Sequence, residues 1–261
     1  MRSVMGPWQS MDLLWMMGAT IGIREPSSYR DAGGERLRRV PLILLIQGIF
    51  AGWILLLLPA FGAESATVTF SLDFPNSDPD HYSIVVTSDG TGRYECSARI
   101  STESEDRETY QAEFRFSDAT RVRIFDLAAQ AHYFSGKVDS GNRKLAFTGA
   151  KKLIYKDGQR ESSAGYNYSL VPAVQQLTAL FQSVAATLEF GRRLSHEHRY
   201  QKLALDEELK RLEDEARRGE ASEIQVVKPV LQEIYNDSSV MNVVRARAER
   251  IMKIGNATPA H

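Results

Sequence analysis

The sequence predicts an α+β protein: an antiparallel sheet of about six or seven strands, packed by helices and followed by a helical C-terminal extension. Three observations support this class. Apolar and polar residues alternate between positions 66 and 117, apolar residues recur every three or four positions from 170 onward, and an uncharged apolar run occupies residues 40–63. A period of two indicates strands and a period near 3.6 indicates helices. The apolar run indicates one N-terminal signal peptide or transmembrane segment in front of the folded part.

The uncharged run decides in which compartment the rest of the chain works. About 20 apolar residues suffice for a helix to cross a bilayer, and basic residues are retained on the cytoplasmic side. Arginines precede the run and acidic residues follow it. Residues 1–39 are therefore expected to form a disordered cytoplasmic leader, and the remainder is expected to be extracytoplasmic, either periplasmic, secreted or membrane-anchored. The membrane or signal segment is marked by Val40, Leu44, Phe50, Trp53, Leu57 and Ala63.

Two interpretations of this segment stay open. A cleaved signal peptide fits the small residues after Pro59, with a cut between about Gly62 and Ser65. A retained membrane anchor fits the length of the run, which exceeds the roughly 7 to 15 apolar residues of an ordinary signal peptide. In the second case the chain has the membrane as a partner through residues 40–63.

Alternation predicts four strands in the first half of the sheet domain, which is expected to span residues 64–169. A meander is the simplest arrangement, because Asp89-Gly90 between the second and third strands favours a hairpin turn. A helix is expected from a cap at Ser117 to about Ala131, with Val122, Phe125 and Ala129 facing inward. Further strands are expected around Leu145 and Phe147, Leu153 and Tyr155, and Tyr166 and Tyr168.

The helical region is expected to span residues 170–254, with a short tail at 255–261. Its first helix carries an apolar seam whose members step by three or four positions, namely Leu170, Val174, Leu177, Phe181, Val184 and Leu188. We expect the seam to cover the sheet; the alternative is a coiled coil with a second copy of the chain. A charged helix from His196 or Gln201 to Arg218 and a helical pair at 223–235 and 239–254 follow, and the three are expected to form a small bundle.

Composition gives no reason to expect a nucleic-acid partner, because 32 basic and 33 acidic residues nearly cancel. The single cysteine, Cys96, alternates with polar neighbours on a predicted strand. We interpret it as a core residue, since a reactive thiol needs an exposed, electropositive environment.

Short motifs give no support for a catalytic residue, a cofactor or a metal. In His196-Glu197-His198 the second histidine is two positions from the first, so on a helix the two cannot share one metal. Asn76, Asp78 and Asp80 have the spacing of a calcium loop, but His81 and Thr87 replace its glycine and glutamate, which favours a polar turn. Asp139-Ser140-Gly141 matches the aspartic-protease tripeptide once, whereas that mechanism needs paired carboxylates.

The sequence therefore favours a non-enzymatic binding or assembly module of the cell envelope, with a protein partner or self-association. Two alternatives remain. One is a carrier for an apolar ligand or lipid, held between the sheet and the seam helix near Phe70, Phe114, Leu177 and Phe181. The other is a hydrolase with an unrecognised site. A basic hairpin at Lys144, Lys151, Lys152, Tyr155 and Lys156 is interpreted as a solvated strand face, the alternative being contact with anionic lipid or a polyanion.

Overall fold

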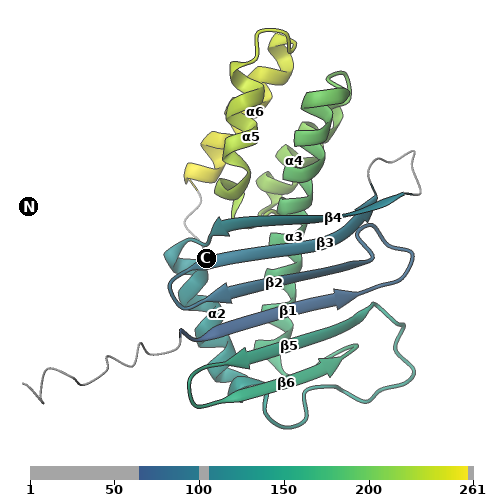
Figure 1. The fold of residues 1–261 in the computed structure, drawn as a ribbon, viewed down its shortest axis with the longest axis vertical. Coiled ribbons are helices and arrows are strands. Elements are labelled where there is room, and N and C mark those ends of the chain that lie inside the picture. The colour runs from purple at the N-terminus through teal and green to yellow at the C-terminus, as the bar shows by residue number, and fades with distance from the viewer. Residues whose placement is uncertain (1–64, 100–105, 258–261) are drawn as a thin grey trace, which may run out of the picture. The chain divides into compact units, whose positions relative to one another are not determined.

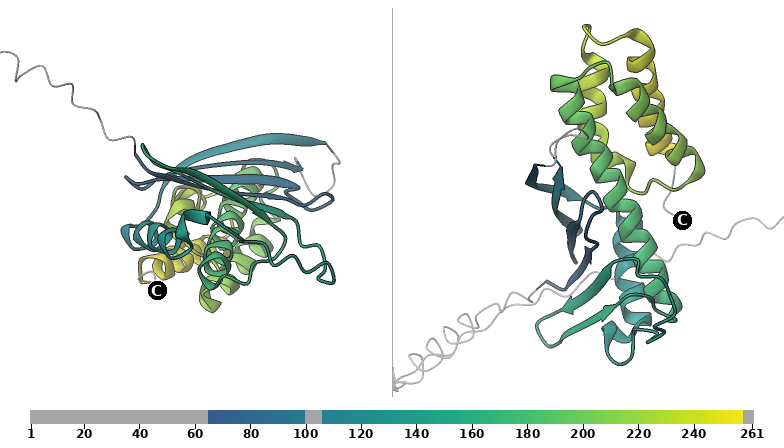
Figure 2. Two further views of the ribbon diagram at one scale, coloured as in Figure 1. Left: turned by 90° about the horizontal axis from the view of Figure 1, so that it is seen from below. Right: turned by 90° about the vertical axis from the view of Figure 1, so that its right-hand side faces the viewer.

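The structure, a computed structural model, confirms the α+β class: an open antiparallel sheet carries helices on one of its faces (Figures 1 and 2). It describes residues 65–99 and 106–257, which belong to one compact unit, Phe61–His261. The predicted leader, the membrane or signal segment at 40–63 and the last residues of the tail lie outside the described residues.

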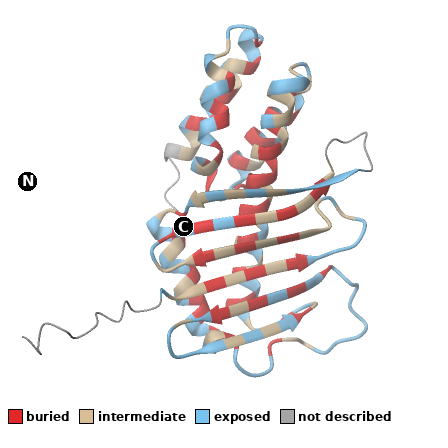
Figure 3. Ribbon diagram, in the orientation of Figure 1, coloured by how far each residue is buried: buried red, intermediate tan, exposed pale blue. Residues whose placement is uncertain are grey.

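The first four strands form the predicted meander. They are β1 (Thr67–Asp73), β2 (His81–Thr87), β3 (Thr91–Arg99) and β4 (Arg107–Arg115). In the register of β1 with β2, Phe70 pairs with Ile84 and Val68 with Val86, and all four side chains are 0% exposed. The alternation of buried and less buried positions along these strands is visible in Figure 3. The period-two pattern therefore predicted both the strands and the face that they bury.

Two more strands, rather than three, complete the described sheet. They are β5 (Ala150–Lys156) and β6 (Glu161–Tyr166), and the strand order is β4-β3-β2-β1-β5-β6. The strand predicted at Leu145 and Phe147 is wrong, because both residues lie in the exposed loop before β5. Two apolar residues two positions apart are too short a pattern to distinguish a strand from a loop.

Helix α2 (Asp118–Gln130) connects β4 to β5 and packs on the sheet. Ser117 caps it as predicted, accepting a hydrogen bond from the Thr120 backbone N–H. The predicted inward face is wrong at Val122, which is 48% exposed, and at Ala129, which is also exposed, whereas Phe125 is partly buried against the sheet core. The buried residues of the helix are Thr120, Ile124, Leu127 and Ala128.

Helix α3 (Pro172–Tyr200) is the element that joins the sheet to the C-terminal helices. The Phe181 ring stacks on Phe70 of β1 with ring centroids 5.3 Å apart. Leu170 is not part of the seam, because it precedes the helix and is 70% exposed. The remaining seam residues are buried against the sheet core: Val174, Leu177, Phe181, Val184 and Leu188.

The C-terminal helices form a second core around the distal half of α3. They are α4 (Leu205–Arg218), the 3-10 helix Ile224–Val227, α5 (Lys228–Asn236) and α6 (Asn242–Ala257). The predicted charged helix does not begin at His196, since α3 continues to Tyr200. Along α4, Glu207 pairs with Arg211 and Glu213 with Arg217, each at four-residue spacing. On α6, Val243 is 54% exposed.

A buried polar cluster fastens α3 to the sheet. Glu189 of α3 accepts hydrogen bonds from the Tyr94 hydroxyl at 2.8 Å and the Cys96 thiol at 3.2 Å. Arg192 donates to Glu189 at 2.9 Å and to the Arg99 backbone carbonyl at 3.0 Å. Burial, and then the Glu189 carboxylate, raises the pKa of the Cys96 thiol to about 12. Cys96 is 1% exposed and is thus the core residue that its strand pattern predicted.

The stacking of Phe181 on Phe70 gives a direct test of how α3 is held. Truncating Phe181→Ala removes a fully buried ring, and we expect the free energy of unfolding to fall by about 3–5 kcal/mol. Leu170→Ala, at the exposed seam position, should change it by less than about 0.5 kcal/mol. Denaturant titration of both variants measures the difference; equal losses would contradict this packing.

Candidate functional site

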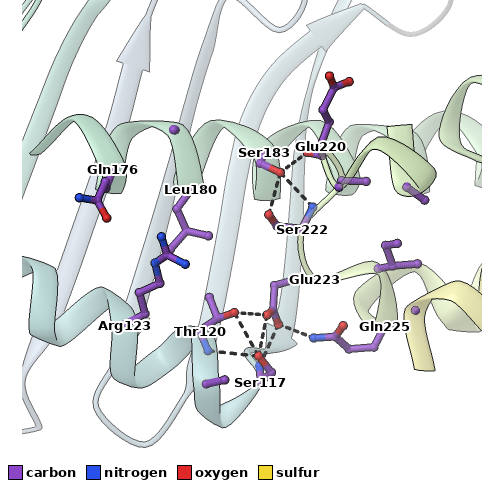
Figure 4. Close-up of a pocket in the computed structure, with 17 residues that line it drawn as sticks. Ser117, Thr120, Arg123, Gln176, Leu180, Ser183, Glu220, Ser222, Glu223 and Gln225 are labelled. Atoms are coloured by element: carbon purple, nitrogen blue, oxygen red, sulfur yellow. Dashed lines mark hydrogen bonds between the residues drawn. The ribbon is translucent and has the colours of Figure 1, made fainter. Parts of the chain in front are cut away.

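A cleft of about 830 Å³ lies where α2, α3 and the C-terminal helices meet (Figure 4). Its walls come from the start of α2, the middle of α3, the α4 end with the linker that follows it, and Gly255 of α6. The apolar or small lining residues include Ala119, Ala179, Leu180, Ala216, Ala221 and Ile224. This volume lies within the range of about 300–1,000 Å³ that is usual for ligand sites.

Glu223 closes one end of the cleft by binding the start of α2. Its carboxylate accepts hydrogen bonds from the Ser117 backbone N–H at 2.8 Å, the Ser117 hydroxyl at 2.7 Å and the Thr120 hydroxyl. Gln225 also donates to it. A helix N-terminus presents unpaired N–H groups and a positive dipole end, so an acidic group is stabilised there. Glu223 therefore links the bundle to the sheet layer.

The linker between α4 and Glu223 is also fastened to α3. The Ser183 hydroxyl of α3 donates to the Glu220 backbone carbonyl and accepts from the Ser222 backbone N–H at 2.9 Å. The two serine hydroxyls are 2.8 Å apart. Gly219, with a φ of +72°, ends α4 in the left-handed conformation that glycine adopts readily. The cleft wall formed by the linker is thus held at both ends.

Three larger side chains occupy the open part of the cleft. Arg123 extends from α2, and Gln176 and Leu180 extend from α3, into the space between the two helices (Figure 4). This set offers an apolar surface with a guanidinium and an amide for orienting a ligand. Among the hydroxyl groups that line the cleft, that of Ser183 donates to a backbone carbonyl, and those of Ser117 and Thr120 donate to a Glu223 carboxylate that also binds the Ser117 backbone N–H. The arrangement fits binding better than acyl transfer.

The carrier site predicted from the sequence does not coincide with the cleft, and its space is occupied by side chains. Phe70, Leu177 and Phe181 are each 0% exposed. A void large enough for water would expose the atoms that line it, so these three residues border none. Phe114 lies apart from them and its ring packs on Phe116, at 4.8 Å between centroids.

The histidine motif lies at the end of α3. The His198 Nε2 atom lies 2.9 Å from Asp237 Oδ2. The centroids of the His196 and Tyr200 rings are 5.1 Å apart. Glu197, between them, has an Oε2 atom that makes no hydrogen bond to any described residue. Burial, and then the neighbouring Glu208 carboxylate, raises the pKa of Glu197 to about 7. The two histidines thus have separate partners, as their spacing predicted.

The other candidate motifs are turns. Asp78 accepts from the Arg99 backbone N–H at 2.9 Å, and Asp80 pairs with Arg107 at 3.0 Å. Asp139 accepts from the backbone N–H groups of Gly141 and Asn167. In residues 65–99 and 106–257, no group of three or more histidine, cysteine or acidic residues is placed to hold a metal ion.

The basic hairpin divides into exposed and buried members. Lys144 and Lys152 are exposed, whereas Lys151 is 6% exposed and points back into the loop before β5. Burial lowers the pKa of the Lys151 amine. The description of the hairpin as one solvated face is therefore wrong for Lys151 and for Tyr155, which is also 6% exposed.

Comparison with known proteins does not extend these observations: no protein-family model matches the chain, and no curated protein is a significant match. Within the described ranges, no helix combines the length and apolarity needed to span a bilayer. The sequence analysis missed the cleft, because Glu223 contacts residues more than a hundred positions away. The helix cap at Ser117 was the one sequence feature that could have indicated this site.

The Glu223 contacts predict that replacing either of two acids in the same linker lowers the free energy of unfolding by different amounts. Glu223→Ala removes the carboxylate that the Ser117 backbone N–H and the buried Thr120 hydroxyl bind, so the free energy of unfolding should fall by about 2–3 kcal/mol. Glu220→Ala removes an exposed carboxylate paired only with Arg218 and should cost less than about 0.5 kcal/mol. Denaturant titration compares them; a loss for Glu220→Ala as large as that for Glu223→Ala would refute the linkage.

The raised pKa of Glu197 predicts a pH dependence of stability. The folded state binds this proton more tightly than the unfolded state, so the free energy of unfolding should fall as the pH rises from about 4.5 to about 7. Glu197→Gln should therefore stabilise the protein by about 1–2 kcal/mol at about pH 8, and by almost nothing at about pH 4.

Thermal or denaturant unfolding at the two pH values measures this effect. The matched control is Glu233→Gln, at an exposed position of α5. A stabilisation of Glu197→Gln that is equal at both pH values, or one shared by Glu233→Gln, would show that Glu197 does not titrate as described.

Proposed function

We propose that this protein is a non-enzymatic binding module of the cell envelope, which holds a ligand with an apolar body in the cleft between α2, α3 and the α4–α6 bundle. The observation that carries the proposal is the cleft itself, with its mainly small and apolar walls and the Arg123 and Gln176 side chains within it. Ligand sites commonly combine an apolar lining with a few polar groups that orient the ligand.

The fixed walls of the cleft support binding by a preformed site. Ser183 and Glu223 hold the linker on two sides, and α3 supplies one wall from a helix whose other face is buried. A preformed site binds more tightly because little conformational freedom is lost on binding.

The proposed location rests on the uncharged run at residues 40–63, with arginines before it and acidic residues after it. The module is then either tethered by this segment or released by its cleavage. Its seam helix is buried on the sheet, so assembly through a coiled coil of α3 is not part of the proposal.

Native mass spectrometry of the full chain purified from its host's envelope tests the proposal. We expect a bound species of defined mass in the wild type. Ala179→Trp, at an exposed position in the cleft wall, should fill the space and remove that species. Ala129→Trp, on α2 and not among the lining residues, is the matched control and should retain it.

Either of two results would reject the proposal. One is a wild-type protein that carries no adduct in any envelope preparation. The other is an adduct that Ala179→Trp retains at the wild-type level while its circular dichroism and unfolding midpoint match those of Ala129→Trp.

A further inference from the structure

Five exposed apolar side chains lie around one end of the central strands, where β1 ends and β5 begins. Asp73 at the end of β1 pairs with Ala150 at the start of β5, and the Phe74 and Phe147 rings meet edge to face at 5.9 Å. Phe147 is 57% exposed and Leu170 is 70% exposed. The five residues are Phe74, Leu145, Phe147, Tyr168 and Leu170. We name this set the edge patch.

The backbone of the edge patch is firmly held, so its exposure is not the result of a loose loop. The buried Lys151 amine donates to the backbone carbonyls of Thr148 at 2.9 Å, Gly149 at 3.2 Å and Asn167 at 3.1 Å. The Asn167 side chain donates to the Ala146 carbonyl and accepts from the Thr148 N–H, both at 3.0 Å. Phe147 is therefore fixed between two residues that Asn167 binds.

Four exposed bases lie in the loop before β5 and in β5 itself. None of them forms an ion pair with a carboxylate in the described part of the chain. They are Lys137, Arg143, Lys144 and Lys152. Two acids lie beside them: Asp139, whose carboxylate accepts the backbone N–H groups of Gly141 and Asn167, and Asp73, which pairs with His81 at 2.5 Å. The patch thus combines apolar side chains with a net positive charge.

We propose that the edge patch docks on the anionic surface of a lipid bilayer. Bilayer interfaces accept aromatic and aliphatic side chains at the headgroup boundary, and anionic headgroups attract nearby lysine and arginine side chains. A soluble polyanion would be bound by the bases alone and gives no role to Phe147 or Leu145. This surface is separate from the cleft, so the inference does not depend on the ligand proposed there.

A second group of exposed apolar residues serves as an internal control. Tyr200 ends α3 and Leu203 lies in the connection to α4, next to the α5–α6 turn. There Lys202 pairs with Asp237 at 2.6 Å, and the Arg199 guanidinium lies over the Tyr200 ring at 5.8 Å from its centroid. This group has fewer unpaired bases beside it than the edge patch, so we expect it to prefer an anionic membrane less.

The test places an environment-sensitive fluorophore on the full chain and reads whether one site enters a lipid interface. Ala146→Cys puts the label in the edge patch and Leu203→Cys puts it at the control site. Cys96 is 1% exposed and is therefore protected from the reagent. Each labelled protein is reconstituted in nanodiscs of phosphatidylcholine alone, or of phosphatidylcholine mixed with phosphatidylglycerol.

We expect a several-fold rise and a blue shift in emission at position 146 in the anionic nanodiscs, and no comparable change at position 203. The double substitution Arg143→Glu and Lys144→Glu, both at exposed loop positions, should lower the docked fraction roughly tenfold. The proposal is overturned if both labels respond equally, if the charge reversal has no effect, or if soluble heparin gives the same response without lipid, which would indicate a polyanion partner.

Discussion

The structure depends on one helix, α3, that is buried along its length in two different cores. Its first half covers the sheet through Val174, Leu177 and Phe181, and its second half enters the bundle core through Phe190 and Leu194. Between them, Glu189 and Arg192 bind Tyr94, Cys96 and the Arg99 carbonyl of β3. A buried charge pair is stable only when its hydrogen bonds are satisfied, so this cluster fixes the position of α3 on the sheet.

The cleft is a consequence of that constraint. Helix α3 contributes side chains to both cores. The chain comes back to the sheet layer at the linker after α4. Glu223 binds the start of α2 there, and Ser183 binds the linker to α3. The space left between α2, α3 and the linker is lined mainly by small residues, which cannot fill it. The proposed binding site therefore follows from how the two cores are joined.

Local patterns predicted most of the fold. The alternation of apolar and polar residues predicted the meander and the burial of Cys96, and the apolar seam predicted α3. The strand prediction failed where the pattern was short, as at Leu145 and Phe147. The predicted buried face of a helix failed where apolar residues occur on more than one side of it, as at Val122. The cleft could not be predicted, because its contacts join residues distant in sequence, such as Ser117 and Glu223. The burial of the Lys151 amine could not be predicted either, because the sequence pattern around a buried lysine does not differ from that around a solvated one.

The functional account depends most on the compartment, since binding in the cell envelope needs the folded part outside the cytoplasm. The decisive measurement is the intact mass and N-terminal sequence of the protein recovered from separated cytoplasmic, soluble extracytoplasmic and membrane fractions of its host. The account predicts either a mature N-terminus near residues 63–65 in the soluble extracytoplasmic fraction, or a chain that retains residues 40–63 in the membrane fraction. A chain that retains those residues and is found in the cytoplasmic fraction would contradict it.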